Sequence, residues 1–506
     1  MIRSAIARIR PAWPWAALTL AIFVAGAVMS ALRRTDVDIG WLLTMGEKMM
    51  AGQRPYIDLF EANPPMSILL YLPAVISGHG LGVAPDAMVN VLVLVSIICS
   101  LALSGRVLAP WIEDRARLWK LAAAGAFVLT LLPTGVFGQR EHIAVIAMLP
   151  FLATTVARGE GRRPAAWIAA VAGLGCGVAM AIKPHFALVA GGAMLVSAWR
   201  LRSIRPLVTL EVWTASLMVG LYALVIATLF PAFLGFLPVI RDTYLPVRKP
   251  LAMLMSFPPA LTWLVLAALA GLIARTRQEA RWPVAGLLAA SVGGFVSYLI
   301  QGKGWPYQSY PMLALAFLAL GVSVSLGGSI AALSADRAGA VRAPMRATAV
   351  ALIVMIVVTG SSMRWFTLKG DYHFLNAPVE AIAARPRLLS IGADIAVGHP
   401  LTRELHGQWV GSVCSQWIST GAMALEQRGG LTAAQRARLD GLMAMDRRLL
   451  TRDITVGRPD VILISTGSWD WLAWARADPA LAAALTAYHP VQTVQDVAIW
   501  ARNPAS

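Results

Sequence analysis

The hydrophobic positions of this chain gather into long apolar runs that are separated by short polar segments. A transmembrane helix needs about 20 apolar residues to cross the core of a bilayer. About eleven runs come near that length, and they lie near residues 13–32, 87–107, 119–137, 141–157, 165–182, 186–199, 206–230, 257–274, 283–300, 310–334 and 346–362. The pattern therefore predicts a multi-span α-helical membrane protein.

Two apolar stretches need separate treatment. The first run follows three arginines and lacks a small-residue cleavage site, so we interpret it as a span rather than a signal peptide. Residues 65–82 are also apolar, but Pro73, Gly78 and Gly80 make a poor helix. We expect this second stretch to be interfacial or re-entrant, on the outer side of the membrane.

The pattern changes beyond Arg364, where the long apolar runs stop. Short apolar runs bounded by turns predict strands, and longer periodic segments predict helices. The expected strands are 388–391, 461–464 and 494–500, and the expected helices are 433–450 and 469–485. We therefore expect a transmembrane domain over residues 1–363 and a small extracytoplasmic α/β domain over residues 364–506.

The composition supports a membrane location, and the placement of Lys and Arg along the chain explains the positive net charge. Hydrophobic residues make up 58% of the chain and charged residues 14%, against roughly 25% charged in an average soluble domain. A net charge of +17 is also typical of nucleic-acid-binding proteins. With the N-terminus in the cytoplasm, however, 19 of the 43 Lys and Arg lie in cytoplasmic segments, 10 in outer loops and 14 in the C-terminal region. Because positive charge stays inside, this balance indicates orientation, and no nucleic-acid partner is expected.

The most unusual polar segment runs from Arg33 to Pro65 and directly follows the first apolar run. It holds five of the 26 acidic residues: Asp36, Asp38, Glu47, Asp58 and Glu61. Apolar residues between 41 and 49 recur at near-helical spacing, which predicts an amphipathic helix along the bilayer surface that ends at Gly52. The two prolines at 64 and 65 then forbid a continuous helix. Carboxylates on a broken loop indicate a site rather than a connector.

Three short outer loops carry polar residues to the same predicted side as this acidic segment. They join spans three and four at residues 138–142, spans five and six at 182–186, and spans nine and ten at 301–308. The basic cytoplasmic loops, in contrast, resemble generic anchors. The candidate binding residues on the outer loops are Arg140, His142, Lys183, His185, Lys303, Trp305 and Tyr307.

Carboxylates on one loop and cations on others suit the transfer of a group that is carried on a lipid phosphate. A carboxylate can take the proton from an attacking hydroxyl as a general base. Lys and Arg can bind a phosphate and stabilise its charge as it leaves, and Trp or Tyr can stack on a sugar ring. Together these residue types predict the transfer of a sugar from a polyprenyl-phosphate carrier to a hydroxyl acceptor.

The order of these features resembles the GT-C superfamily of multi-span glycosyltransferases, nearest to its aminoarabinose-transferase and protein O-mannosyltransferase branch. Those proteins share an N-terminal span, a first outer loop with an acidic motif, an interfacial helix and a Pro-Pro-apolar segment. Here that segment is Asn63-Pro64-Pro65-Met66 with Leu69-Leu70-Tyr71. The likeness covers about residues 10–360 in architecture, and its specific motif is confined to about residues 36–71.

The resemblance implies that Asp36 or Asp38 is the catalytic carboxylate. The family often shows two adjacent acids, whereas this chain has Asp36-Val37-Asp38, so the choice of base stays open. In an extended segment both side chains point to one side, and we favour Asp38. Glu61 is the candidate for binding the acceptor or a metal, and a helical segment would place Asp58 on the same face as Glu61.

The resemblance also implies the substrates and the location. The donor is expected to be a polyprenyl-phosphate sugar whose phosphate is held by Arg140, Lys183 and Lys303. The acceptor is expected to be a lipid, glycan or protein of the cell envelope, at a bacterial inner membrane with a periplasmic C-terminal domain. Members of the superfamily differ in their need for a divalent cation, so metal dependence stays open. The three cysteines of the chain show neither metal-ligand spacing nor a disulfide framework.

Other interpretations of the same residues remain open. Residues 140–142 would then be a simple helix start, Lys183 a snorkelling anchor, and Trp305 and Tyr307 members of an interfacial aromatic belt. The competing function is a lipid-linked sugar flippase or transporter, although the predicted spans hold almost no ionisable groups. A third alternative is a scaffold whose activity resides in the C-terminal domain.

Overall fold

The computed structural model describes residues 11–327, 342–368, 370–467 and 469–504. The contacts divide the chain into two compact units, each assembled from separate stretches of sequence. The helical unit comprises Met1–Arg33, Val89–Ala223 and Lys249–Leu368, and the sheet unit comprises Arg34–Met88, Leu224–Arg248 and Lys369–Ser506. The three N-terminal arginines and residues 328–334 of the tenth predicted span lie outside the described residues.

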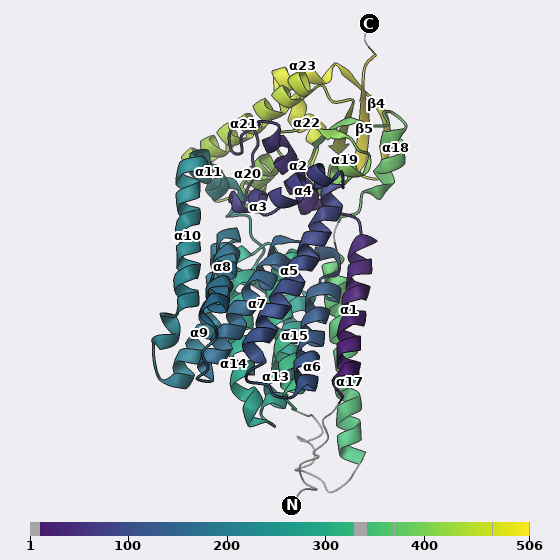
Figure 1. Ribbon diagram of the computed structural model, residues 1–506. Helices are drawn as coiled ribbons and strands as arrows, with labels where there is room; N and C mark the ends of the chain where they lie inside the picture. The colour runs from purple at the N-terminus through teal and green to yellow at the C-terminus, as the bar shows by residue number, and fades with distance from the viewer. Residues whose placement is uncertain (1–10, 328–341, 369, 468, 505–506) are drawn as a thin grey trace, which may run out of the picture. The chain divides into compact units, whose positions relative to one another are not determined.

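Each predicted span coincides at least in part with a helix, and most of these residues belong to the helical unit (Figure 1). The helices are α1 (Trp13–Ala31), α5 (Pro85–Leu108), α6 (Arg115–Ala126), α7 (Arg140–Gly159), α8 (Ala166–Ile182), α9 (Ala187–Leu201), α10 (Leu210–Leu229), α13 (Pro258–Ala274), α14 (Gln278–Gln301), α15 (Tyr310–Ser325) and α17 (Arg342–Phe366). In the described part of the chain, 7 helices are long and apolar enough to cross a membrane, and α8 and α13 are apolar but shorter. The prediction of a multi-span helical protein is confirmed, and the count of eleven spans stays a prediction.

The third predicted span is not a single α-helix. α6 ends at Ala126 and continues as a π-helical turn, Phe127–Leu131. Pro133 then removes a backbone donor, and the chain turns through a short 3-10 helix at Thr134–Val136. The prediction of one helix over residues 119–137 was therefore wrong at its C-terminal end.

Small residues let α9 and α14 pack closely. A Cβ atom on Gly293 would lie 2.3 Å from the carbonyl oxygen of Leu188, and one on Gly192 would lie 2.4 Å from that of Ala289. Helices in lipid associate through such close approaches, because apolar burial alone gives them no driving force there. This packing holds the start of α9 against α14, and both helices border the predicted site loops.

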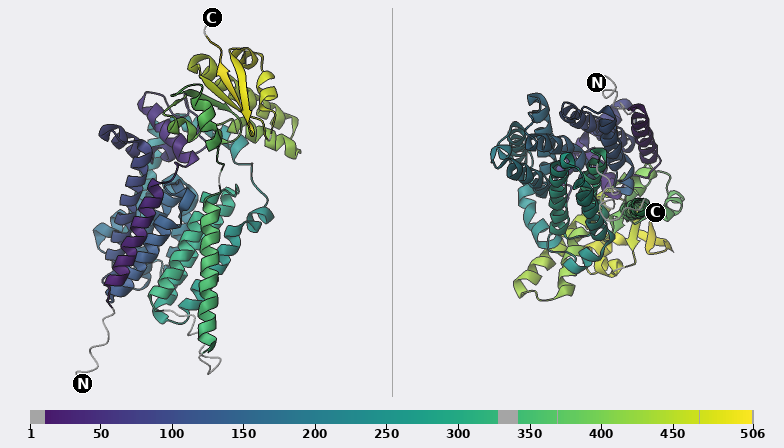
Figure 2. Two further views of the ribbon diagram at one scale, coloured as in Figure 1. Left: turned by 90° about the vertical axis from the view of Figure 1, so that its right-hand side faces the viewer. Right: turned by 90° about the horizontal axis from the view of Figure 1, so that it is seen from below.

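The sheet unit contains a five-stranded sheet of order β2-β1-β3-β5-β4 (Figure 2). β1 (Arg387–Ile391) pairs in parallel with β2 (Gln408–Trp409) and with β3 (Val461–Ser465). β5 (Val497–Arg502) pairs antiparallel with β3 and with β4 (Tyr488–Val494). The helices of this region are α18 (Asn376–Glu380), α19 (Leu401–Glu404), α20 (Trp417–Arg428), α21 (Ala433–Gly457), α22 (Trp471–Arg476) and α23 (Pro479–Leu485). The predicted small α/β region is confirmed, and its extracytoplasmic location stays a prediction.

Two element boundaries in this region differ from the predictions. The predicted strand at 494–500 is the hairpin of β4 and β5, which turns at Gln495 with a positive φ of 52°. The predicted helix at 469–485 is two helices, because the Asp478 side chain caps α23 and Pro479 suits the first turn of a helix.

Within the sheet unit, the acidic segment contains α2 (Val37–Met50), and the apolar stretch after it forms α3 (Met66–Leu69) and α4 (Leu72–Leu81). The expected amphipathic helix is α2, which buries Trp41 and Leu42. The expectation of a poor helix at residues 65–82 was wrong. Pro73 stands in the first turn of α4, where its missing N–H is not needed, and Gly82 ends that helix with a φ of 67°.

Residues 34–88 pack with the C-terminal residues of the chain in one unit. The Phe60 N–H donates to the Ser412 carbonyl oxygen at 2.9 Å. The Phe60 ring also joins an apolar cluster with Phe236 and Ile418. The predicted boundary between two domains at residue 363 stays a prediction. In the structure, the contacts group the acidic segment with the C-terminal region.

One arginine joins three elements of the sheet unit. Arg403 of α19 donates to both carboxylate oxygens of Glu47 in α2, at 2.8 and 3.0 Å. Its Nε donates to Asp86, in the first turn of α5, at 2.8 Å. The Arg403 side chain is 11% exposed, so these bonds form largely out of contact with water.

We predict that Arg403→Met destabilises the sheet unit by about 2 kcal/mol or more, because two partly buried carboxylates lose their partner. Thermal unfolding of the purified full-length protein, followed by circular dichroism, measures the effect. Arg502→Met is the matched control, since Arg502 forms a more exposed pair with Asp460 and should change stability by about 0.5 kcal/mol or less. Equal melting temperatures for Arg403→Met and the wild type would contradict the prediction.

Candidate functional site

In the sheet unit, Asp36 caps α2. Its backbone is extended (φ −66°, ψ 147°), and its Oδ1 accepts the N–H of Asp38 at 3.0 Å. Asp is favoured at this position because its carboxylate satisfies an N–H that no helical carbonyl reaches. The expectation that both residues lie in an extended segment and face one way was therefore wrong. Asp36 is buried at the cap, and Asp38 is half-buried in the first turn of the helix.

Glu61 is buried and hydrogen-bonded within the same unit. It accepts the indole N–H of Trp41 at 2.6 Å and the backbone N–H of Asn63 at 3.0 Å. Because Trp41 belongs to α2, these bonds fix the loop that precedes the two prolines against the helix that carries Asp38.

Asp58 does not share a helical face with Glu61, so that expectation was wrong. Residues 56–58 form a turn, with Tyr56 at a positive φ of 65°, and residues 59–61 are not helical. Asp58 accepts the backbone N–H of Arg54 at 2.8 Å and the Arg54 Nε–H at 3.1 Å, and these bonds lower the pKa of the Asp58 carboxyl. Asp58 therefore stabilises the turn.

The segment between β2 and α20 adds a residue that the sequence analysis did not identify. Burial raises the pKa of the Cys414 thiol well above its usual value, and the nearby charges of Glu61 and Asp38 raise it further. Both carboxylates therefore lie close enough to act on one thiol from the C-terminal region. No spacing or motif marks Cys414, because it comes near these acids only through the tertiary fold.

In the helical unit, three of the predicted site loops meet. α7 begins at Arg140, and Glu141 in its first turn is fully buried. Glu141 Oε1 accepts a hydrogen bond from Lys183 Nζ at 2.5 Å, and Lys183 Nζ also donates to Gln301 Oε1 at 2.7 Å. Since Lys183 follows α8 and Gln301 ends α14, one amine joins the ends of three helices. A buried pair of this kind differs from a snorkelling anchor.

Two predicted site cations, Arg140 and Lys183, lie beside the ring of Tyr307. Its ring centroid lies 5.4 Å from Lys183 Nζ and 6.0 Å from the Arg140 guanidinium carbon, which are distances at which a cation is attracted to an aromatic face. The Trp305 ring lies 5.8 Å from the Tyr307 ring and is 39% exposed. The structure therefore brings together four predicted site residues from three loops.

Lys303 lies in the tight loop that follows α14. Gly302 and Gly304 on either side both have a φ of 68°, which glycine adopts without strain. Lys303 is 9% exposed, and a Cβ atom on Gly304 would lie 2.5 Å from the ring of Phe257. Two glycines and close packing therefore define the position of this lysine.

The two predicted histidines have different surroundings. Gly138 donates its N–H to His142 Nδ1 at 2.9 Å, and His142 Nε2 lies 2.9 Å from the carbonyl oxygen of Leu129. A carbonyl only accepts, so Nε2 carries the proton and both ring nitrogens of His142 bond to the backbone. His185 is half-buried, and burial together with the charge of Lys183 lowers its pKa to about 3. His185 is therefore neutral at physiological pH.

The described residues do not bring together three His, Cys, Asp or Glu side chains that could hold a metal ion.

No protein-family model matches this chain, and no curated protein matches its sequence significantly. Solved structures do match its fold. ArnT from Cupriavidus metallidurans in the apo state aligns with a TM-score of 0.57 at 15% identity, over 98% of this chain and 100% of that chain. ArnT bound to undecaprenyl phosphate aligns with a TM-score of 0.55 at the same identity and coverage. The oligosaccharyltransferase of Archaeoglobus fulgidus aligns at 0.48 and 11% identity, over 93% of this chain and 72% of that chain.

The likeness to ArnT extends over nearly the whole of both chains, and at this identity it is a likeness of fold. The predicted resemblance to the GT-C glycosyltransferases is therefore confirmed for the fold.

We predict that Lys183→Met destabilises the helical unit by about 3 kcal/mol, because it leaves the buried Glu141 carboxylate without its cation. Adding Glu141→Gln should restore much of that loss, since the uncompensated charge is removed. The thermal stability of the wild type, both single variants and the double variant, measured in one detergent, gives the coupling energy. Additive effects of the two substitutions would show that the pair has no structural role.

Proposed function

We propose that this protein is a membrane glycosyltransferase that moves a sugar from a polyprenyl-phosphate carrier to a hydroxyl group of a cell-envelope lipid, glycan or protein. The observation that carries the proposal is the cluster of Arg140, Lys183 and Tyr307, which forms where three predicted outer loops meet. The cluster belongs to a chain whose fold matches ArnT, a protein that has been solved with undecaprenyl phosphate. A phosphate group is the ligand that such cations suit best.

The cations of the helical unit are assigned to the donor phosphate. Arg140 and Lys183 lie beside one aromatic ring, and Lys303 follows α14 in a loop that its glycines shape. Lys183 is paired with Glu141 in this group. The cations stabilise the phosphate as it gains negative charge on leaving the sugar. Trp305 and Tyr307 offer apolar faces to the sugar or the lipid.

Asp38 is assigned as the general base because it is less buried than Asp36 and Glu61, and a base must be within reach of the acceptor hydroxyl. Asp36 caps α2, and Glu61 holds Trp41 and Asn63. Asp38 is the half-exposed acid of the three. In the reaction, the acceptor oxygen forms a bond to the anomeric carbon and the bond from that carbon to the phosphate oxygen breaks. The phosphate leaves with the electron pair, and the acceptor proton goes to Asp38.

The other predicted residues receive supporting roles. His142 fixes the start of α7 through its two backbone bonds, and neutral His185 is placed near the lysine that holds the phosphate. Glu61 orients the acid loop toward the acceptor. The predicted cytoplasmic N-terminus and outer C-terminal region rest on the distribution of Lys and Arg. The bacterial inner membrane is implied by the resemblance to the GT-C glycosyltransferases.

A lipid-linked sugar flippase is the second candidate, and the observations favour it less. The fold match is to a transferase along its full length. At the end of α7 and the start of α10, the charged pair of Arg158 and Glu211 is bidentate, at 2.5 and 2.8 Å, and leaves the Glu211 carboxylate buried against its partner. Such a satisfied pair is typical of a structural contact rather than of an ion pathway.

We predict that Asp38→Asn lowers turnover by at least about 100-fold while donor binding is retained, because the proton acceptor is lost but the cations remain. The assay uses full-length protein in lipid with a panel of radiolabelled polyprenyl-phosphate sugars. Asp36→Asn is the matched control, since its amide oxygen can still cap α2, and its turnover should stay within about threefold of the wild type.

Lys303→Ala in the same assay should weaken donor binding. Loss of turnover in Asp36→Asn but not in Asp38→Asn would transfer the role of base to Asp36. Wild-type behaviour of both Asp variants, with no donor bound, would refute the proposed function and direct attention to lipid transport.

A further inference from the structure

The sheet unit contains a cavity of about 810 Å³ that Asp36, Asp38 and Glu61 do not line. Its walls come from α2 and the turn after it, the start of α5, the segment from α19 to β2, and α21. The volume lies within the range of about 300–1,000 Å³ that is typical of small-molecule sites. The cavity is therefore large enough for a ligand of the size of one or two sugar rings.

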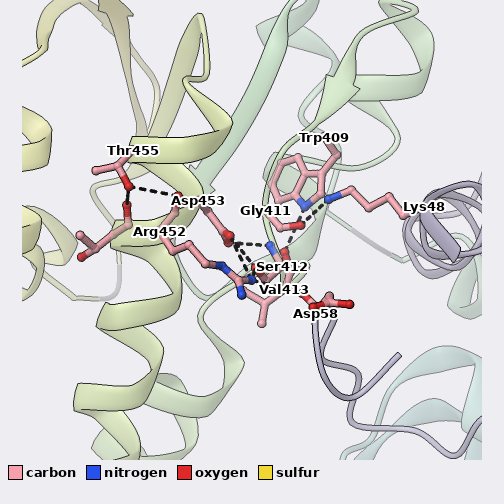
Figure 3. A network of polar contacts seen from close by, with 10 residues as sticks. Lys48, Asp58, Trp409, Gly411, Ser412, Val413, Arg452, Asp453 and Thr455 are labelled. Carbon is pink, nitrogen blue, oxygen red and sulfur yellow. Dashed lines mark hydrogen bonds and ion pairs between the residues drawn. The ribbon is translucent and has the colours of Figure 1, made fainter. Parts of the chain in front are cut away.

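Charged side chains at this cavity contact the backbone segment of Gly411 and Ser412, as Figure 3 shows. Lys48 of α2 donates to the carbonyl oxygen of Gly411 at 2.7 Å, and Arg452 of α21 donates to Ser412 Oγ at 2.5 Å. Asp453 accepts the backbone N–H and the hydroxyl of Ser412, at 2.6 and 2.5 Å. Two cations from different helices therefore converge on two consecutive residues.

Most other charges of the lining neutralise one another. Arg403 is bonded to Glu47 and Asp86, and Asp58 is bonded to Arg54 beside the cavity. Over the whole lining, four cations (Lys48, Arg387, Arg403 and Arg452) meet four carboxylates (Glu47, Asp58, Asp86 and Asp453). Two of the carboxylates bind Arg403, so that Lys48 and Arg452 share one, Asp453.

The state of Lys48 is consistent with a site for an anion. Burial lowers the pKa of Lys48 to about 8, Asp453 raises it and Arg452 lowers it. An anion bound beside Lys48 would compensate this amine for lost hydration, and the exposed Arg452 is close enough to bind the same anion. Two close cations with one shared carboxylate are thus suited to a ligand that carries its own negative charge.

The rest of the lining suits hydroxyl groups. Gln53 and Gln408 contribute amide groups, which can both donate and accept hydrogen bonds. The hydroxyls of Thr44 and Thr402 donate to the carbonyl oxygens of Gly40 and Gly398 and can still accept. A sugar hydroxyl also donates and accepts at once, so it can be satisfied by such neighbours. The cavity therefore combines an anion site with walls for a polyhydroxylated ring.

We propose that this cavity binds an anionic sugar of the acceptor glycan, with its carboxylate or phosphate group beside Lys48 and Arg452. The inference rests on the proposed transferase function for the identity of the ligand as acceptor. One backbone segment connects the cavity to the acids, since Ser412 lines the cavity and Cys414 lies within the electrostatic reach of Glu61 and Asp38. A glycan held here therefore lies beside the segment that approaches the proposed base.

The test measures binding of three probes to the full-length protein in lipid nanodiscs by saturation-transfer NMR. The probes are D-glucuronic acid, glucose 1-phosphate and uncharged glucose, which separate a carboxylate, a phosphate and the ring alone. The variants are Lys48→Met and Arg452→Gln. Arg448→Gln is the matched control, because Arg448 is exposed on the same helix one turn before Arg452 and does not line the cavity.

We expect at least one anionic probe to bind about tenfold or more tightly than glucose, and Lys48→Met and Arg452→Gln each to weaken it about tenfold or more. Arg448→Gln should bind like the wild type. Equal binding of glucose and both anionic sugars, or wild-type binding by both cavity variants at wild-type melting temperature, would overturn the proposal.

Binding of undecaprenyl phosphate, measured on the same samples, separates this proposal from the proposed function. If undecaprenyl phosphate does not bind while the anionic sugars do, the transferase function fails and the role of acceptor falls with it. If undecaprenyl phosphate binds while the sugars do not, the cavity assignment fails and the transferase function stands.

Discussion

A charge that leaves water must be paired, and the helical unit depends on this constraint at its candidate site. The Glu141 carboxylate is fully buried at the start of α7, where an isolated charge would be strongly destabilising. Lys183 supplies the opposite charge and also bonds to Gln301. Because these residues come from three separate helix ends, satisfying one carboxylate fixes the loops that also carry Arg140 and Tyr307. The same interaction therefore supports the structure and concentrates cations in one place.

The charged groups of the sheet unit are also paired, and there several carboxylates have structural roles. Arg403 binds Glu47 and Asp86, and Glu61 accepts two N–H groups. The bonds from Arg403 to Glu47 thereby join the acidic segment to the C-terminal region, and those to Glu61 hold the segment together. Among the three candidate acids, Asp38 is the half-exposed one, at the start of α2, and this exposure is why it is the proposed base.

The sequence predicted the elements better than their contacts. Long apolar runs in the sequence locate the helices. Successive spans cross the membrane in alternate directions, which places the loops with Arg140, Lys183 and Tyr307 on one side, and the structure brings these residues together. The cap formed by Asp36 follows a local rule that the assumption of an extended segment overlooked. The bond from Phe60 to Ser412, the position of Cys414 and the two-residue strand β2 arise from long-range packing, which leaves no periodic pattern in the sequence.

A density map of the full-length protein in nanodiscs with undecaprenyl phosphate would test the central claim most directly. The account predicts that the lipid phosphate lies within hydrogen-bonding distance of at least two of the three cations Arg140, Lys183 and Lys303. It also predicts that the Glu141–Lys183 pair persists in the bound state, since the buried carboxylate still needs its partner. A phosphate bound away from all three cations would contradict the assignment of the donor site and, with it, the proposed mechanism.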